Sequence, residues 1–431
     1  MIPVSEPFFL AYRSATIALG PFAPMLLSWR QRRGKENGRR LRERIGWASA
    51  KRPDGRLAWL HGASVGEALA LLPLVEKLIA RGLEVLVTTG TVASAAVLAD
   101  RLPPRAIHQF IPIDVPAFAK RFLDYWRPDI VLFAESEIWP NFFHETSQRS
   151  IPLVLVNARL SRRSYRRWRI IPKAIGPLLA RIDLVLAQTR EDGLRLARLG
   201  APRVQVAGNL KYDVPPPPIN QMALGELSAE IGPRPLWLAA STHPEEESAI
   251  LDAHLFLAEN RPSILTILAP RHVDRAGDIA TIAAQRGIRS ARRSLSQPIT
   301  RDVGLYIADT MGELGLFYRL AGLVFVGKSI GQAEGGQNPI EPAKLGAAIL
   351  HGPNVENFRE VYEAIDAARG AALVADGSTL GRVLALLLAD PAQARTLARG
   401  AAEAVDRLGG ATTSVMAALE PFLMQLQLAQ R

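Results

Sequence analysis

The first half of the chain alternates short runs of apolar residues with longer amphipathic stretches. Between Leu71 and Ile79, apolar residues recur at i, i+3, i+4, i+7 and i+8, which predicts a helix that ends near Gly82. The apolar runs cover residues 57–63, 84–90, 107–113, 129–135, 151–158, 183–189 and 203–208. Continuous runs of Val, Ile and Leu linked by helices are typical of parallel strands buried on both faces, so we predict a parallel α/β domain.

Four consecutive prolines at 215–218 interrupt this alternation. They exclude a helix or a central strand and predict a stiff, extended linker. Beyond them the apolar runs resume at residues 235–241, 264–270, 303–308, 323–327, 347–352 and 371–375. We therefore predict two similar α/β domains: a first domain at 47–214, a linker at 215–232, and a second domain with the terminal helices at 233–431.

The composition fits two large buried cores and an anionic partner. Of 431 residues, 48% are hydrophobic and 22% charged, and one core rarely serves so long a chain. The chain has no cysteine, which excludes disulfides, thiolate metal sites and cysteine nucleophiles and suits the cytoplasm. A formal charge of +11 predicts binding to nucleic acid, phospholipid or a phosphorylated substrate.

The N-terminus combines an apolar segment with a basic one. Residues 7–29 are mostly apolar, although Arg13, Gly20, Pro21 and Pro24 interrupt them. The next segment, at 30–44, has eight basic and two acidic residues, a net charge of +6. This order predicts an interfacial or re-entrant membrane anchor at residues 1–46, with the rest of the chain on the cytoplasmic side. An ordinary buried first helix is the alternative.

Polar motifs follow the apolar runs directly. Ligands of parallel α/β sheets bind in the loops at the carboxyl ends of the strands, so we expect the site there. The motifs in such places are HGASVGE (61–67), ESEIWPN (135–141), NARLS (157–161), GNLKYD (208–213), STHPEEE (241–247), PRH (270–272), DTMGEL (309–314) and GGQNPIEPA (335–343).

The motif HGASVGE has two interpretations. Ser64 and Glu67 have the spacing of a capping box, in which each side chain accepts from a free N–H at the start of a helix. The same spacing holds an ionised carboxylate at a strand end, where it can act as a general base. Glu67 is thus a cap, a base or both.

Other charged residues also stand at strand ends. Glu135 and Glu137 follow one apolar run, while Lys211 precedes the linker and Arg271 follows a run of the second half. The carboxylates stand at the edge of the first domain and the two cations near the linker. We therefore predict a nucleotide on the second domain, an acceptor on the first, and reaction in the cleft between them. Alternatively, both glutamates are solvated acids in the first turn of a helix, where the helix dipole favours them.

The segment GGQNPIEP has features of a nucleotide site. Gly335 and Gly336 allow close approach of the backbone, and a helix that starts near Pro339 offers free N–H groups to an anion. Glu341 can hold a ribose diol. His243, ahead of Pro244, is a capping or packing residue, and His272 beside Arg271 is a phosphate donor or a surface residue. No zinc-binding spacing, Walker A, G-x-S-x-G or G-x-G-x-x-G motif occurs in the sequence.

Six arginines alternate with Tyr165 and Trp168 at residues 159–169. Arginine on phosphates with aromatic side chains on bases is how proteins bind single-stranded nucleic acid. A bisphosphorylated lipid at a membrane surface would use the same charges, so both partners stay open.

In order and content, the eight motifs resemble those of the Kdo transferases, the 3-deoxy-D-manno-octulosonic acid transferases of lipopolysaccharide assembly. The resemblance runs from the N-terminal anchor to GPNVENF at 352–358. It implies a GT-B glycosyltransferase, with two Rossmann-like domains facing across a cleft. It also implies inverting transfer of Kdo from CMP-Kdo to the phosphorylated lipid A precursor, lipid IVA, at the cytoplasmic face of the inner membrane. No metal, cofactor or nucleic acid is implied.

By match of motif, the resemblance implies roles for individual residues. Glu67 is similar in place to the proton acceptor, and Glu135 and Lys211 to transition-state stabilisers. The implied contacts of CMP are Pro270, Arg271, Met311, Gly312, Glu313, Asn338, Pro339, Ile340 and Glu341.

The sequence departs from the family pattern near the donor motifs. Gln337 stands where the family usually has His, Glu245 replaces a common Gly, and residues 327–334 differ from the usual glycine-rich stretch. The alternatives are a GT-B transferase of another nucleotide sugar and, more remotely, a basic nucleic-acid-binding protein.

Overall fold

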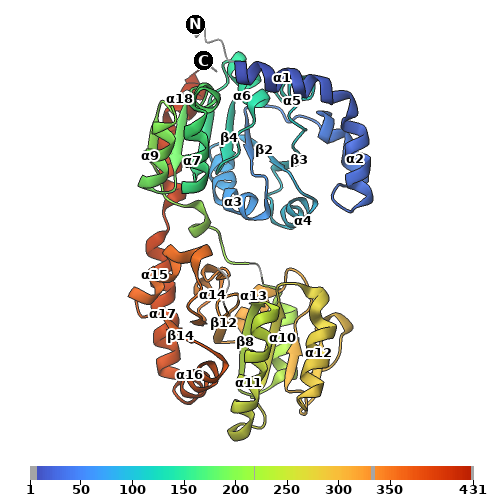
Figure 1. Cartoon of the computed structure of the whole chain (residues 1–431), viewed down its shortest axis with the longest axis vertical. Coiled ribbons are helices and arrows are strands. Elements are labelled where there is room, and N and C mark those ends of the chain that lie inside the picture. Colours follow the sequence, from blue (N-terminus) through green and yellow to red (C-terminus); the bar gives the residue numbers. More distant parts are fainter. Residues whose placement is uncertain (1–6, 218, 332–334, 429–431) are drawn as a thin grey trace. The chain divides into compact units, whose positions relative to one another are not determined.

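A computed structural model of the chain describes residues 7–217, 219–331 and 335–428 (Figure 1). The chain divides into two compact units, Met1–Val214 with Gly409–Arg431, and Pro215–Leu408. Each unit has a seven-stranded parallel sheet. The apolar runs predict all seven strands of the first unit but only six of the second, because the short edge strand at Ser290–Arg292 has no apolar run.

The sheet of the first unit has the strand order β3-β2-β1-β4-β5-β6-β7. Its strands are β1 (Leu57–His61), β2 (Glu84–Thr89), β3 (Ala106–Phe110), β4 (Ile130–Ala134), β5 (Leu153–Ala158), β6 (Leu184–Ala187) and β7 (Val204–Val206). Leu57 and Trp59 pack in one apolar cluster, while Ala58 and Leu60 pack in another. Because alternate residues of a strand face opposite sides, the sheet is buried on both faces.

Helices cover both faces of this sheet. One face packs against α3 (Val65–Ala80), α4 (Val92–Arg101) and α18 (Ala411–Leu428). The other packs against α5 (Pro116–Trp126), α6 (Pro140–Gln148), α7 (Arg162–Ile170), α8 (Pro172–Leu179) and α9 (Arg190–Arg198). The chain changes direction between β1 and β4, so the loops after these two strands flank the switch point where ligands of such sheets bind.

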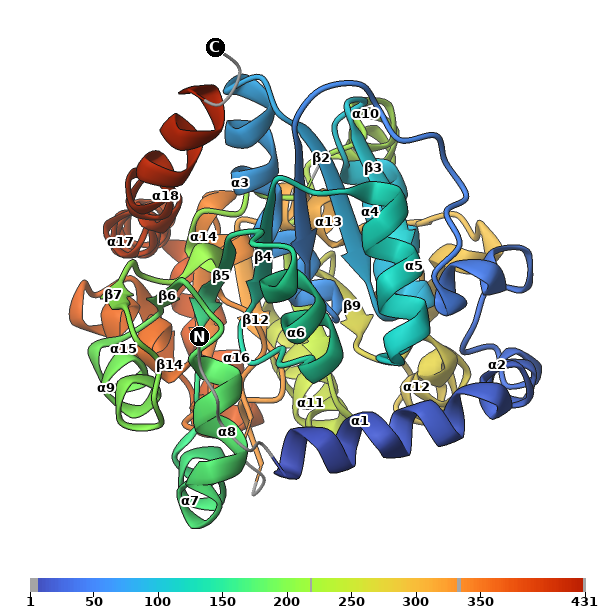
Figure 2. The same ribbon diagram turned by 90° about the horizontal axis from the view of Figure 1, so that it is seen from above.

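The C-terminal helix α18 belongs to the first unit, whereas the sequence division placed it in the second. Figure 2 shows α18 beside α3. Val415, Leu419 and Leu423 of α18 are buried in the same cluster as α3. The carboxylate of Asp213 accepts the backbone N–H groups of Gly410 and Thr412 at the helix start. The amphipathic pattern of a helix shows which of its faces is buried, but not which unit it packs against. The predicted domain boundary was therefore wrong for α18.

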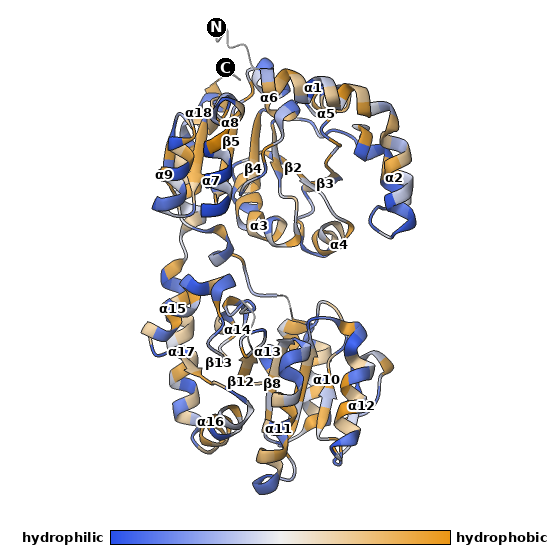
Figure 3. Cartoon of the chain, viewed as in Figure 1, coloured by the Kyte–Doolittle hydropathy of each residue, from blue (hydrophilic) through white to orange (hydrophobic). Residues whose placement is uncertain are grey.

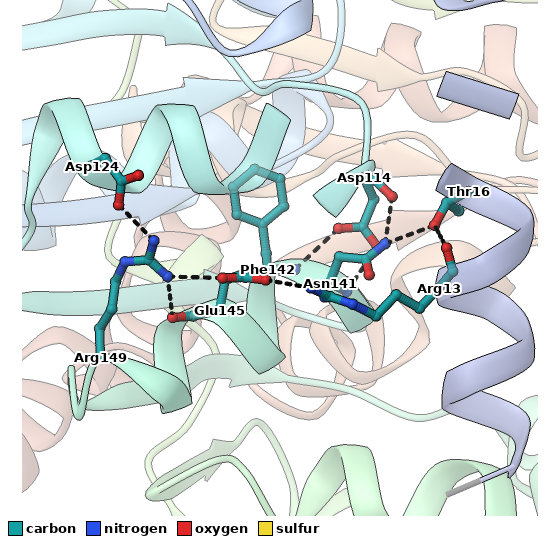
Figure 4. Close-up of polar contacts among 8 residues, drawn as sticks. All are labelled: Arg13, Thr16, Asp114, Asp124, Asn141, Phe142, Glu145 and Arg149. Carbon is teal, nitrogen blue, oxygen red and sulfur yellow. Dashed lines mark hydrogen bonds and ion pairs between the residues drawn. The ribbon is translucent and has the colours of Figure 1, made fainter. Parts of the chain in front are cut away.

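The N-terminal segment packs on the first unit as α1 (Pro7–Leu19), a short turn η1 (Gly20–Phe22) and α2 (Ala23–Arg32). In Figure 4, Arg13 Nη2 lies 2.9 Å from Glu145 Oε1, and Asn141 Nδ2 donates to Thr16 Oγ1 over 3.1 Å. The same figure shows Arg149 paired with Asp124 and Glu145. Polar contacts therefore fix α1 to α6.

The alternative of an ordinary buried first helix is wrong. Only Phe9 of α1 and Ala23 and Leu27 of α2 are buried. The large apolar side chains exposed on α1, η1 and α2 are Phe8, Leu10, Tyr12, Ile17, Leu19, Phe22, Met25, Leu26 and Trp29. Within the described ranges, we find no helix with the length and hydropathy to cross a bilayer.

Some basic residues of the segment 30–44 stabilise the fold. The end of this segment lies in the 3-10 helix η2 (Gly38–Ile45). Arg30 and Arg44 pair with the buried carboxylate of Glu36, and Arg40 pairs with buried Glu43 at 2.7 Å. Three of the eight positive charges are thus engaged inside the protein.

The second unit has the strand order β10-β11-β9-β8-β12-β13-β14. The strands are β8 (Leu236–Thr242), β9 (Leu265–Pro270), β10 (Ser290–Arg292), β11 (Leu305–Ile307), β12 (Leu323–Val326), β13 (Ala348–His351) and β14 (Ala371–Leu373). The helices are α10 (Gln221–Ile231), α11 (Pro244–Asn260), α12 (Ala276–Gln285), α13 (Leu314–Leu320), α14 (Ile340–Lys344), α15 (Arg359–Ala367), α16 (Gly377–Ala389) and α17 (Pro391–Leu408). Figure 3 shows apolar strands between helices with mixed surfaces.

The predicted linker at 215–232 is too long. Helix α10 occupies Gln221–Ile231, and the Asn220 side chain caps it by accepting the N–H of Ala223. Asn220, two positions after the last proline, is a helix start signal that the sequence analysis missed.

Candidate active site

Two predicted site residues of the first unit, Glu135 and Lys211, meet at the carboxyl edge of its sheet, and Lys211 lies near Gly66, the residue before Glu67. Lys211 Nζ, which follows β7, lies 2.5 Å from Glu135 Oε1, which follows β4. A Cβ on Gly66, next to Glu67, would lie 3.9 Å from Lys211 Cε. Residues far apart in sequence thus meet because the strands are parallel and end at the same edge.

Glu67 caps α3 with one change from the predicted pattern. Ser64 Oγ accepts the N–H of Glu67 over 3.3 Å and donates to Glu67 Oε1 over 2.7 Å. Glu67 Oε2 accepts the N–H of Ala63 over 2.8 Å, where a capping box would use the N–H of Ser64. The cap is therefore confirmed, and the half-buried carboxylate keeps lone pairs for another donor.

Glu135 is held in an uncommon backbone conformation. Its φ is +55°, in the left-handed region, and its N–H donates to Val156 O over 3.0 Å. Such strain is typical of functional sites because the surrounding structure must maintain it. The ion pair with Glu135 fixes the position of the Lys211 ammonium group at the sheet edge.

The alternative of solvated first-turn acids is wrong for both glutamates. Helix α6 begins only at Pro140, and the two side chains are mostly buried. Glu137 Oε2 accepts Trp139 Nε1–H over 2.8 Å and lies 3.6 Å from His61 Nε2. Burial raises the pKa of Glu137, but the contacts with His61 and Trp139 outweigh it, so the pKa is lowered and Glu137 holds the loop as a carboxylate.

Asn157 positions Lys211, a role that the sequence analysis missed. Its side-chain oxygen accepts the N–H of Leu210 over 3.0 Å, and Asn209 Oδ1 accepts the N–H of Lys211 over 3.1 Å. Asn157 has a φ of +52° directly after the apolar part of β5. An Asn at a strand end, where left-handed φ is common for this residue type, is the signal that could have found it.

In the second unit, two predicted donor motifs form one pocket. Pro270 and Arg271 line a pocket of about 60 Å³ together with Met311 and Gly312. The Arg271 side chain is exposed and makes no hydrogen bond or ion pair with any described residue. A free guanidinium beside a small pocket is suited to a phosphate.

Glu313 stabilises the loop that forms this pocket. Its carboxylate pairs with Arg293 at 2.7 Å and accepts the hydroxyl of Thr310. The hydrogen bond from Arg293 holds the pKa of Glu313 below its ordinary value, despite partial burial. Arg293 had no motif to mark it, because it comes from a separate short turn.

The NPIE residues lie at the start of the five-residue helix α14. Asn338 Oδ1 accepts the N–H of Ile340 over 3.0 Å, and Asn338 Nδ2 donates to Glu341 Oε1 over 3.3 Å. The side chains of Pro339 and Ile340 are buried, so these two residues offer only backbone atoms to a ligand.

Glu246 organises the donor side, and the sequence analysis missed it. Its buried carboxylate accepts the N–H groups of Lys328, Ser329 and Ile330 over 2.6, 2.7 and 3.0 Å, and that of His243 over 3.2 Å. One carboxylate thus joins the loop after β8 to the loop after β12.

Gln337 contacts His243 directly, since Gln337 Nε2 lies 3.0 Å from His243 Nε2. Burial and the neighbouring Lys328 lower the pKa of His243. Among the described residues, no group of three or more side chains that could hold a metal ion was found.

Residues 39–214 match the family model described as 3-deoxy-D-manno-octulosonic-acid transferase (kdotransferase). The 3-deoxy-D-manno-octulosonic acid transferase of Bordetella pertussis is 35% identical over 424 residues, covering 95% of this chain and 98% of that protein. The probable mitochondrial 3-deoxy-D-manno-octulosonic acid transferase of Arabidopsis thaliana is 32% identical over 409 residues, covering 92% of each.

A solved glycosyltransferase from Rickettsia africae ESF-5 matches the fold with a TM-score of 0.56 at 10% identity, covering 86% of this chain and 98% of that one. The two parallel-sheet units and this neighbour agree with the expected GT-B class. The relatives extend over nearly the whole chain at more than 30% identity, which confirms the resemblance carried by the eight motifs. The chain belongs to the Kdo transferase family of glycosyltransferases.

Proposed function

We propose that this Kdo transferase moves Kdo from CMP-Kdo to the lipid A precursor, lipid IVA, with inversion at the anomeric carbon. The meeting of Lys211 with Glu135 beside the loop of Glu67 supports this proposal most directly. In this proposal, Glu67 is the acceptor of a proton and Lys211 is the cation for a leaving phosphate, both at one edge of the first unit.

The reaction is a single displacement. A hydroxyl oxygen of the acceptor bonds to the anomeric carbon of Kdo while the bond from that carbon to the CMP phosphate oxygen breaks. The bonding electron pair leaves with CMP, and Glu67 takes the hydroxyl proton. Lys211 stabilises the negative charge that develops in the transition state, and Glu135 holds Lys211 in place.

The second unit supplies the donor site. Arg271 is free to contact the phosphate of CMP. Pro270, Met311 and Gly312 form the walls of the pocket beside it. Asn338 and Glu341 offer polar groups to the ribose. Glu313 supports this site indirectly, because Arg293 and Thr310 occupy its carboxylate.

The acceptor side lies on the anionic inner membrane, at its cytoplasmic face. Phe22, Met25, Leu26 and Trp29 recur at i, i+3, i+4 and i+7 and are all exposed, so they form one apolar stripe. Unpaired basic residues follow in the segment 32–42 and attract anionic headgroups. An apolar stripe next to positive charge is typical of interfacial helices.

The test is turnover by the purified chain. CMP-Kdo and detergent-dispersed lipid IVA are incubated with the enzyme, and mass spectrometry of the lipid measures addition of Kdo. Competition by CMP against UDP separates this proposal from the alternative of another nucleotide sugar. Absence of a Kdo-bearing lipid, or inhibition by UDP but not by CMP, contradicts the proposal.

A further inference from the structure

Helices α7 and α9 of the first unit enclose a groove that the proposed reaction does not use. Its volume is about 460 Å³. Figure 3 shows α7 as one of the most hydrophilic helices of the unit, and no residue of α7 is buried. The residues that line the groove are Arg162, Tyr165, Arg166, Arg169, Glu191, Leu194, Arg195 and Arg198.

Most of the positive charge in this groove is uncompensated. Arg162, Arg166 and Arg169 lie at i, i+4 and i+7 on one face of α7, all exposed. Neither they nor Arg198 of α9 form an ion pair or hydrogen bond among the described residues. The only acidic residue of the lining, Glu191, already pairs with Arg195. Four guanidinium groups therefore remain available.

This arrangement costs stability in the free protein. Helix α7 has five arginines and no acidic residue. Like charges one turn apart destabilise a helix by about 0.2–0.5 kcal/mol for each pair. An anion in the groove would relieve this repulsion.

The two aromatic residues of α7 favour a phosphate group over single-stranded nucleic acid as the anion in the groove. Tyr165 and Trp168 are half-buried and pack against the apolar cluster under the sheet. They anchor α7, and of the two only Tyr165 lines the groove, whereas single-stranded nucleic-acid binding stacks successive bases on several aromatic side chains. The guanidinium groups are the unpaired charges of the lining, and they match the oxygens of a phosphate in charge and fork geometry.

The geometry points to a binding site for a phosphomonoester group in the groove between α7 and α9. The phosphate belongs either to a lipid headgroup or to a soluble phosphorylated molecule. Arg166 and Arg169 contact it from α7, and Arg198 contacts it from α9. The site does not depend on the proposed transfer reaction, because binding needs neither Glu67 nor the donor.

Two double variants of α7 test this site. Arg166→Glu with Arg169→Glu reverses two groove charges. Arg163→Glu with Arg167→Glu makes the same charge change on the same helix, at exposed positions outside the groove lining. The probes are phosphatidylcholine vesicles containing phosphatidic acid, glycerol 3-phosphate, and a single-stranded RNA oligonucleotide. Circular dichroism checks folding, and Arg198→Gln on α9 replaces the groove variant if that variant does not fold.

We expect the groove variant to lose at least about tenfold in affinity for a phosphomonoester, because charge-assisted hydrogen bonds are lost. The matched variant should lose less than about threefold. Selective loss on vesicles assigns the phosphate to a lipid, and selective loss on glycerol 3-phosphate assigns it to a soluble ligand. Equal losses in both variants, or selective loss for RNA alone, overturn the proposal.

Discussion

Glu67 combines a structural and a proposed chemical role in one carboxylate. Its oxygens accept from the Ala63 N–H and the Ser64 hydroxyl at the start of α3. A cap of this kind contributes about 1 kcal/mol to stability. The chemical role requires in addition that the group accept a proton, which an amide cannot do.

Glu67→Gln separates the two roles. The amide oxygen can keep one of the two capping contacts, so the melting temperature should fall by only a few degrees. Turnover should fall by about 10²–10⁴-fold in the mass-spectrometric assay, because the general base is lost. Ser64→Ala is the control, since it removes the cap but keeps the carboxylate. Near-wild-type transfer by Glu67→Gln would leave Glu67 as a cap only.

Arg271→Ala tests the donor site. The free guanidinium should form a charge-assisted contact with the phosphate of CMP, worth about 1.5–3 kcal/mol. Calorimetry should therefore show a loss of CMP affinity of about 10–100-fold. Arg301→Ala, at an exposed position outside the pocket, should bind CMP normally. Equal affinities of the Arg271 variant and the wild type count against the assigned pocket.

For individual residues, the sequence predicts those that directly follow a strand. It does not predict those whose role depends on a partner far away along the chain. Glu135 and Lys211 were predicted because each follows an apolar run. Glu246 was missed because it accepts amides more than eighty positions further along the chain. Arg293 was missed because it lies in none of the motifs and meets Glu313, 20 positions further along the chain, only in the folded unit.

At the scale of helices and strands, the loop after β12 is held in place by hydrogen bonds to helix α11 of the same unit. Three successive N–H groups at 328–330 end on the carboxylate of Glu246, at the start of α11. A Gln at this position offers one acceptor oxygen, and its NH₂ group would face N–H donors. Each buried donor without a partner costs about 1–3 kcal/mol.

Glu246→Gln should lower the free energy of unfolding by about 3 kcal/mol. This corresponds to a fall of about 6–12 °C in the melting temperature of the second unit. Glu245→Gln, at the adjacent exposed position, should change it by less than about 2 °C. Similar melting temperatures of both variants would contradict the role of Glu246 in the loop.

Helix α1 is attached through a buried carboxyl group with an unusual pKa. Burial raises the pKa of Asp114 to about 6, although hydrogen bonds from Asn141, Tyr12 and Phe142 lower it. An unfolded Asp titrates near about 3.9, so the folded state holds the proton more tightly. The contribution of Asp114 to stability is therefore most favourable below pH 4 and declines as the pH rises through 6.

The measurement is the free energy of unfolding in urea at pH 4 and pH 7. Between these values the wild type should lose about 2 kcal/mol relative to Asp114→Asn, which has no group to titrate here. Asp124→Asn, an exposed carboxylate near the same helices, should follow the wild type. The same pH dependence in the wild type and in Asp114→Asn would refute the raised pKa.

Helices and strands could be predicted from the sequence where a single pattern, such as a continuous apolar run, is enough to identify them. Buried strands such as β4 and β5 are continuous apolar runs, and sheet burial alone produces that pattern. Helix α10 was missed because the proline signal before it masked a short helix. The assignment of α18 failed because its partner α3 lies more than 300 residues earlier in the chain.

For the whole molecule, a positive charge of +11 and an exposed apolar stripe favour the same partner, an anionic membrane surface. Deleting residues 1–29 would be an unsuitable test. The deletion removes Tyr12 and Arg13, and it leaves buried Asp114 and Glu145 without these partners. Point substitutions on the exposed stripe avoid that cost, because they leave the contacts of α1 intact.

The triple variant Phe22→Ser, Met25→Ser and Leu26→Ser should bind anionic vesicles at least about tenfold more weakly. These side chains are 58, 70 and 47% exposed, and each transfers apolar area from water to lipid at about 25 cal/mol per Å². A triple control at Met222, Leu373 and Met424, also exposed, should bind like the wild type. Cosedimentation measures both, with melting temperature as the folding check.

Salt distinguishes the two parts of this surface. Raising ionic strength weakens the attraction of the unpaired arginines to headgroups but leaves the apolar term. The wild type should therefore keep part of its vesicle binding at high salt, whereas the triple variant should lose nearly all of it. Equal binding by both proteins at high salt would show that the stripe does not enter the bilayer, and the proposed membrane contact would then rest on charge alone.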